Sequence, residues 1–190
     1  MISNLFSSCF SRSIDRQLNP GELMGIHQQL YDEGETFLAN ELYRVWLRFN
    51  DDNPLSFVIY YNLAVMLIHS NELQEARKTF EHVIRVNPAF FLPYYQLGIL
   101  MEQLGETDAA IEYFNLTITK TEETEGSLAT NFDADYYRRM AYQQIMRLNL
   151  RELQNTSLQT ILWNPQTLNQ VQSMAANLLN QPEITIQPSY

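Results

Sequence analysis

The chain has 190 residues, of which 45% are hydrophobic and 12% aromatic, with only 6 Gly and 7 Pro. This composition predicts one folded, mostly helical unit and argues against a disordered chain. The formal net charge of −10 argues against nucleic acid and anionic lipid as partners, because binding to phosphates requires a basic face.

Residues 1–19 carry apolar side chains at helical spacing and predict an amphipathic N-terminal extension. Three outcomes fit this pattern: packing against the first repeat, a mobile tail, or peripheral docking on a membrane or a partner. The segment has no basic residues before its short apolar part, so it does not resemble a secretory signal. The chain contains no apolar run long enough for a transmembrane span. Its single cysteine, Cys9, excludes an internal disulfide, and we expect a cytoplasmic protein.

A repeated pattern dominates the chain from residue 20 onward. Three Asn-Pro pairs are spaced 53 − 19 = 34 and 87 − 53 = 34 residues apart: Asn19-Pro20, Asn53-Pro54 and Asn87-Pro88. The residues Tyr60, Tyr61, Leu63 and Ala64 return at the same offset as Tyr94, Tyr95, Leu97 and Gly98. A period of this length is typical of a tandem array of two-helix units. It predicts helical hairpins at about 23–54, 57–88 and 91–124.

Each predicted hairpin contains a break between two helices. In the first hairpin Gly34 separates helices at roughly 21–33 and 35–50. The second of these helices has one apolar side, which consists of Phe37, Leu38, Leu42, Val45, Trp46 and Phe49. In the later hairpins the turns fall at Ser70-Asn71 and Leu104-Gly105-Glu106.

Small residues recur where the two helices of a hairpin would cross. Ala64 and Gly98 occupy the first helices of the second and third hairpins, and Ala76 and Ala110 occupy the second helices. Two helices approach closely only where no bulky side chain stands at the contact. We expect Phe80 and Phe114 to fill the space beside them.

The period shifts after Thr124, because a segment rich in turn-forming residues follows. A weaker fourth hairpin is predicted at 134–165. The residues 167–179 are predicted to form an amphipathic helix that caps the open end of the array. The folded domain then spans 20–181, and 182–190 form a flexible tail.

The residues of the middle hairpins resemble the tetratricopeptide repeat (TPR) family. Counted from Phe57, the family's diagnostic positions 4, 7, 8, 20, 24 and 32 hold Tyr60, Leu63, Ala64, Ala76, Phe80 and Pro88. The resemblance implies an all-α fold, a right-handed α-solenoid of about four TPR-like hairpins with a C-terminal capping helix.

The resemblance also implies that the first helices line a concave groove that binds a peptide or a helix of a partner protein. The positions implied to bind the peptide are Gln28, Val58, Tyr61, Asn62, Val65, His69, Tyr95, Gln96 and Ile99. The two-carboxylate clamp of some members needs a basic residue and an Asn where this chain has Tyr61 and Val65, so that subtype is rejected.

The amides Gln28, Asn62 and Gln96 recur at 34-residue steps and could form a row that holds a peptide backbone. Such a row is similar to the asparagine ladder of O-linked N-acetylglucosamine transferases. The stretch 41–67 also resembles the repeats that precede the catalytic domain in bacterial members of that group. The alternative hypotheses are amides that only solvate the inner face, and a non-catalytic accessory module that presents protein substrate in a glycosyltransferase system.

The sequence shows no Gly-rich phosphate loop, no paired metal ligands and no nucleophile motif. We therefore expect no enzyme activity, no cofactor and no metal. The expected function is a protein-protein interaction module or scaffold, and the sequence does not indicate its oligomeric state.

Overall fold

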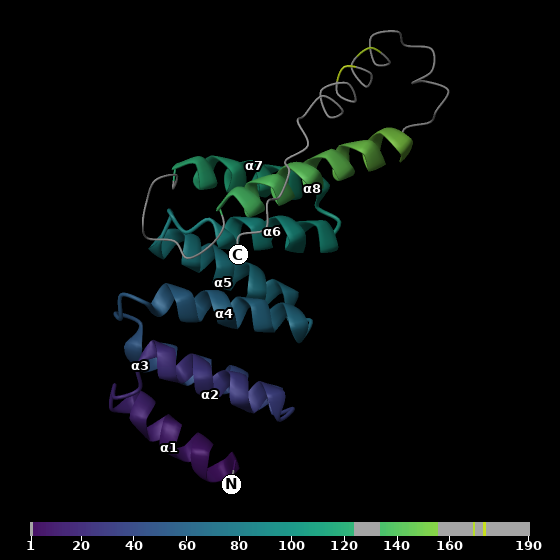
Figure 1. Cartoon of the computed structure of the whole chain (residues 1–190). Coiled ribbons are helices and arrows are strands. Elements are labelled where there is room, and N and C mark those ends of the chain that lie inside the picture. Colours follow the sequence, from purple (N-terminus) through teal and green to yellow (C-terminus); the bar gives the residue numbers. More distant parts are fainter. Residues whose placement is uncertain (1, 124–133, 156–168, 170–172, 174–190) are drawn as a thin grey trace, which may run out of the picture. The chain divides into compact units, whose positions relative to one another are not determined.

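The computed structural model describes residues 2–123 and 134–155, together with 169 and 173. These residues form eight helices and no strand, so the all-α prediction is confirmed (Figure 1). The chain divides into two compact units, Met1–Ile145 and Met146–Tyr190. The features described below lie in the first unit, apart from the C-terminal part of α8 (Ala134–Asn155), which belongs to the second.

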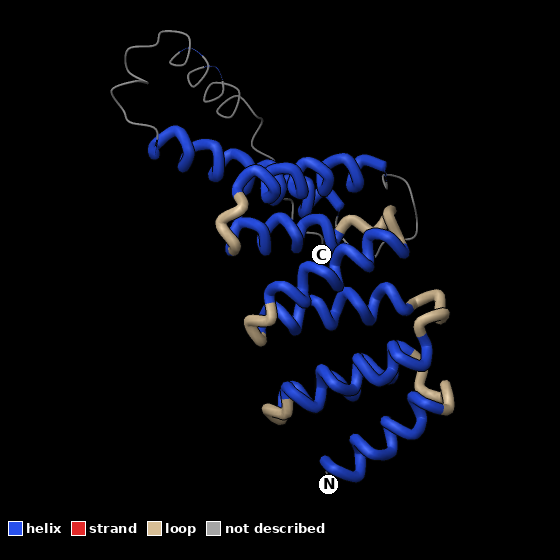
Figure 2. The backbone as a smooth tube through the Cα atoms, turned by 180° about the vertical axis from the view of Figure 1, so that it is seen from behind, coloured by secondary structure: helices blue, strands red, loops and turns tan. Residues whose placement is uncertain are grey.

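Six helices of this unit form three consecutive hairpins. They are α2 (Pro20–Asp32) with α3 (Thr36–Asn50), α4 (Ser56–His69) with α5 (Leu73–Val86), and α6 (Leu92–Gln103) with α7 (Thr107–Glu123). The helices of each hairpin pack on each other, and α3 and α5 also pack on the first helix of the next hairpin. The first helices α2, α4 and α6 lie one above the other in Figure 1, and Figure 2 shows the stack from behind. The fold is an α-solenoid, as predicted.

The turns of the hairpins fall where the sequence predicts them. Gly34 and Gly105 have φ values of 83° and 79°, and Asn71 has a φ of 61° at the corresponding place. This left-handed conformation ends a helix at little cost for Gly and is tolerated by Asn better than by most other residues.

The small residues stand at the helix crossings as predicted. Ala64, Ala76, Gly98 and Ala110 are buried, and the rings of Phe80 and Phe114 are fully buried beside them. At Gly98 the fit is tightest, because a Cβ atom there would lie 2.6 Å from Cε1 of Phe114. Close packing of this kind lets the two helices of a hairpin approach each other closely.

The N-terminal extension forms a helix, α1 (Ile2–Ile14), that packs on α3. Asn50 at the end of α3 donates hydrogen bonds to the backbone oxygens of Ser13 and Trp46, both at 2.9 Å. The Trp46 indole donates to the Leu18 carbonyl at 2.7 Å. Of the three outcomes considered for this segment, the structure has the packed one.

The apolar side predicted for α3 is wrong in part. Leu42 and Trp46 are buried as expected, but Phe37 is 73% exposed and Phe49 is 38% exposed. The buried side instead runs through Ala39, Tyr43, Leu47 and Asn50. The predicted apolar set spans more of the helix surface than α1, α2 and α4 together cover, so its margin remains in solvent.

The fourth predicted hairpin also differs from the structure. Helix α8 (Ala134–Asn155) is one continuous helix of 22 residues, whereas a hairpin at 134–165 would turn near its middle. No Gly or Pro interrupts this sequence, so nothing in the local chemistry ends the helix early. The insertion at 125–133, the predicted capping helix at 167–179 and the tail at 182–190 lie outside the part described, apart from 169 and 173.

Candidate partner-binding face

The first helices of the three hairpins form a continuous surface, which we call the helix-A face (α2, α4 and α6). Helices α2 and α4 are in contact, as are α4 and α6. Side chains also join them: Asn62 Nδ2 lies 3.3 Å from Met24 Sδ, and Gln96 Nε2 donates to the Tyr61 hydroxyl at 3.4 Å. The predicted site residues from α4 and α6 are therefore brought together on one surface.

The aromatic residues predicted to bind a partner are engaged in packing. The Tyr61 ring lies 5.8 Å from the ring of Phe80 and 5.3 Å from that of Phe90. The Tyr95 ring lies 5.7 Å from that of Phe114 and 5.2 Å from that of Tyr137 at the start of α8. Both tyrosines therefore stabilise the hairpin stack, and removing either one would disturb the fold as well as the surface.

A histidine occupies the equivalent position in the first hairpin, since 27 + 34 = 61. His27 is 5% exposed and its ring stacks on that of Tyr43, with a centroid distance of 3.9 Å. Burial lowers the pKa of His27, and the neighbouring Asn40 amide opposes this only partly. Burial also raises the pKa of the Tyr43 hydroxyl. Both groups are therefore neutral at pH 7.

The three amides do not bond to one another in a continuous row. Gln28 is exposed and donates to the Asp32 carboxylate on its own helix at 2.7 Å. Asn62 and Gln96 donate to the neighbouring first helices, through Met24 and Tyr61. The donor groups of all three amides thus have partners within the chain.

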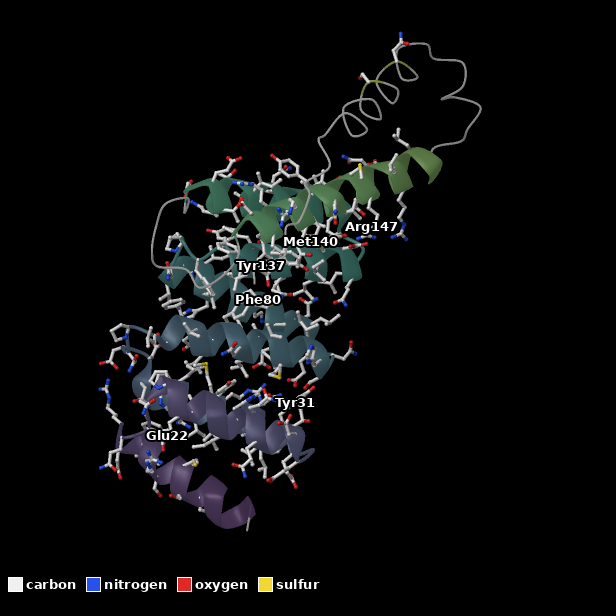
Figure 3. All side chains as sticks on the ribbon, in the orientation of Figure 1. Glu22, Tyr31, Phe80, Tyr137, Met140 and Arg147 are labelled. Carbon is white, nitrogen blue, oxygen red and sulfur yellow. The ribbon has the colours of Figure 1, made fainter. Side chains whose placement is uncertain are left out.

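The sequence reasoning missed one member of the surface, Tyr31. It stands 34 residues before Val65, as Val65 stands 34 before Ile99, so the period alone could have identified it. All three side chains are partly exposed (Tyr31 is labelled in Figure 3). We call Tyr31, Val65 and Ile99 the apolar row. Val58 is also partly exposed and His69 is exposed, at opposite ends of α4.

Charged residues are unevenly divided between the two helices of each hairpin. Helices α2, α4 and α6 contain no Lys or Arg, and their acidic residues are Glu22, Asp32 and Glu102. Glu22 pairs with Arg12 of α1, with Nη2 and Oε2 2.6 Å apart, which lowers the pKa of the carboxyl. The helix-A face is therefore nearly neutral, with a slight excess of negative charge.

The second helices carry the basic residues that link successive hairpins. Arg44 on α3 pairs with Glu72 and Glu75 at 3.4 and 3.1 Å, and Arg77 on α5 pairs with Glu106 at 3.2 Å. Glu72 and Glu106 are 34 residues apart and their partners Arg44 and Arg77 are 77 − 44 = 33 apart, so a similar ion pair recurs along the stack. The charges of the second helices serve the contacts between repeats.

The described residues include no group of three His, Cys, Asp or Glu side chains that could hold a metal ion. Among the same residues, no helix has the length and apolar character needed to cross a membrane.

Comparison with known proteins identifies the class of repeat. Residues 58–90 and 93–118 match the family model described as Tetratricopeptide repeat. A structure titled as a Podosopora anserina putative kinesin light chain with nearly identical TPR-like repeats is 14% identical, with a TM-score of 0.52. That match covers 95% of this chain and 97% of the other.

A crystal structure of MamA protein is 20% identical with a TM-score of 0.48, covering 83% of this chain and 88% of the other. No curated protein sequence matches the chain. The fold itself and the structure with a TM-score of 0.52 define a helical-repeat protein of the all-α solenoid class. More narrowly, the two segments that match the Tetratricopeptide repeat model lie in the hairpin of α4 with α5 and in the hairpin of α6 with α7.

Proposed function

We propose that the protein is an interaction module that binds a peptide segment or a helix of a partner protein across the helix-A face. The observation that carries this proposal is the apolar row. Tyr31, Val65 and Ile99 are partly exposed on three helices, of which α4 contacts both α2 and α6. A solvent-exposed apolar row is a surface that gains free energy when a partner covers it.

The structure changes which residues are the best candidates for this binding. Tyr61 and Tyr95 are committed to packing, whereas Val65 and Ile99 expose part of their apolar surface. Val65 and Ile99 are therefore the preferred anchors, and Val58, Gln28, Asn62, Gln96 and His69 form their surroundings. The glycosyltransferase alternative has no comparable support, because the donor groups of the amides already have partners within the chain.

Site-specific photo-crosslinking tests this proposal directly. A benzoylphenylalanine residue at position 99 should form covalent adducts with a partner in an extract of the source cells, and Val65→Asn should reduce them. The matched control is position 86, because Val86 is 50% exposed at the end of α5, outside the helix-A face. Equal adducts at positions 86 and 99 would show that the face has no special role.

A further inference from the structure

The N-terminal helix α1 has a face that lies in solvent. Its inner side packs on α3 and carries Cys9 and Ser13, which are both buried. Another side of the helix is exposed and combines serines with large apolar residues: Ser7, Phe10, Ser11 and Ile14. At about 100° of rotation per residue, these four side chains fall within an arc of about 100°. They therefore form one surface, which we call the α1 outer face.

This face is more apolar than the end of a solenoid usually is. Helix α1 is the terminal helix of the stack in Figure 1, and terminal units of helical arrays normally present a polar face to solvent. Here Phe10 is 38% exposed and Ile14 is 39% exposed. Phe49 of α3 is also 38% exposed, and its neighbour Asn50 donates to the Ser13 carbonyl of α1. Covering this end with a partner would release free energy.

The distribution of charge favours a second copy of the chain as the partner. The net charge is −10, so two copies repel each other over much of their surfaces. All 22 Asp and Glu residues lie after residue 14, and α1 therefore contains none. Its one charged side chain, Arg12, pairs with Glu22 of the same chain at 2.6 Å. The α1 outer face thus lets a second acidic copy approach without facing a carboxylate on the helix.

The order of side chains on this face is self-complementary. Two α1 helices can pack antiparallel about a two-fold axis that passes between Phe10 and Ser11. Facing residues then have numbers that add up to 21, so Phe10 of one copy lies opposite Ser11 of the other. By the same rule Ile14 lies opposite Ser7. Each large side chain meets a small one, which allows two helices to approach closely.

The serines also permit the removal of water from this face. The Ser11 hydroxyl donates to the Ser7 carbonyl of its own helix at 3.2 Å. This hydrogen bond is retained when a partner covers the helix, so burial does not leave the hydroxyl without an acceptor. The face carries no charged group that would lose its hydration. Its polar residues are therefore compatible with an interface.

From the exposed apolar residues, the absence of carboxylates and the self-complementary order, we propose that the protein forms a homodimer in which the outer faces of two α1 helices pack antiparallel. The interface does not use α2, α4 or α6, so the dimer is independent of the proposed function. One helix from each copy covers less than the roughly 800 Å² per partner of a standard interface. The dimer is therefore weak and forms reversibly with concentration.

Sedimentation equilibrium of the full chain tests this association. The average mass should rise from 22.3 kDa toward twice that value as the protein concentration increases. Added salt should strengthen the dimer, because it screens the repulsion between two acidic copies. Phe10→Asp should weaken association about tenfold or more, since a carboxylate would be buried in the interface. The control is Phe37→Asp, at a 73% exposed position of α3, which should leave association unchanged.

Circular dichroism of both variants checks that the helices remain. A chain that stays monomeric at every concentration would overturn the proposal, and binding of α1 to lipid vesicles by such a monomer would assign the face to a membrane instead. An equal loss of association in the two variants would also overturn it.

Cysteine crosslinking tests the antiparallel arrangement separately. Ser11→Cys places a thiol beside the proposed axis, whereas Ser8→Cys places one on a different side of the same helix. The native Cys9 is 1% exposed and gives the background reaction. A short bis-maleimide reagent should join the Ser11→Cys chains into covalent dimers and leave the Ser8→Cys chains monomeric. Equal yields for the two variants, or no dimer from Ser11→Cys, would refute this arrangement.

Discussion

The contact between Gly98 and Phe114 allows a quantitative prediction about stability. A Cβ atom at residue 98 would lie 2.6, 2.7 and 2.9 Å from three carbons of the Phe114 ring. Real Cβ atoms essentially never approach a neighbour so closely. The ring is fully buried, so it cannot swing into solvent to relieve the overlap. Gly98→Ala must therefore push α6 and α7 apart or force the ring into an unfavourable rotamer.

The size of the effect follows from two opposing contributions. Overpacking a well-packed core by one methyl group costs about 1–3 kcal/mol. Replacing Gly by Ala within a helix contributes about 0.5–1 kcal/mol in the stabilising direction. The overlap with three ring carbons places the overpacking cost in the upper part of this range. The free energy of unfolding should therefore fall by about 1–2 kcal/mol.

Urea denaturation followed by circular dichroism measures this change. The matched control is Gly25→Ala in α2, where a Cβ would meet nothing within 4 Å. This control should stabilise the protein by about 0.5–1 kcal/mol because only the helix preference acts. Adding Phe114→Leu to Gly98→Ala should recover part of the loss expected from summing the single changes. A Gly98→Ala protein as stable as the Gly25→Ala protein would refute the argument.

Three further predictions concern the first hairpin and its contacts. Asn50→Leu should remove the two hydrogen bonds that the Asn50 amide donates and cost about 1–3 kcal/mol, and faster proteolysis near residue 14 than in the parent protein would reveal the loosened α1. His27 has a lowered pKa in the folded state, so the unfolded state binds more protons and stability should fall as the pH decreases below about 6.5. His27→Gln should remove this part of the pH dependence of thermal unfolding. The control is His69→Gln, and an equal effect of that change would contradict the prediction for His27. Arg44→Met should cost up to about 1 kcal/mol in low salt and less at 1 M salt, because its ion pairs are partly exposed; a cost that did not change with salt would argue against this explanation.

The sequence by itself determined the repeat architecture. The 34-residue offset that returns Tyr60 as Tyr94 predicts both the number of residues in a hairpin and where each hairpin begins. Gly34, Asn71 and Gly105 mark the turns, because few other residues adopt a positive φ easily. The structure also confirms the predicted packing of a small residue beside a Phe, since both residues recur with the same period. These features are local or periodic, and for that reason they can be read from one chain.

The tertiary structure decided which side chains remain available on the surface. Tyr61 and Asn62 are neighbours in sequence, and nothing in the repeat pattern says that the ring of Tyr61 packs on Phe80 and Phe90. Exposure of Phe37 likewise depends on how far α1, α2 and α4 reach around α3, and no single helix encodes that. Only the structure shows that Tyr31, Val65 and Ile99 keep part of their surface in solvent, because partial burial is a property of contacts between hairpins.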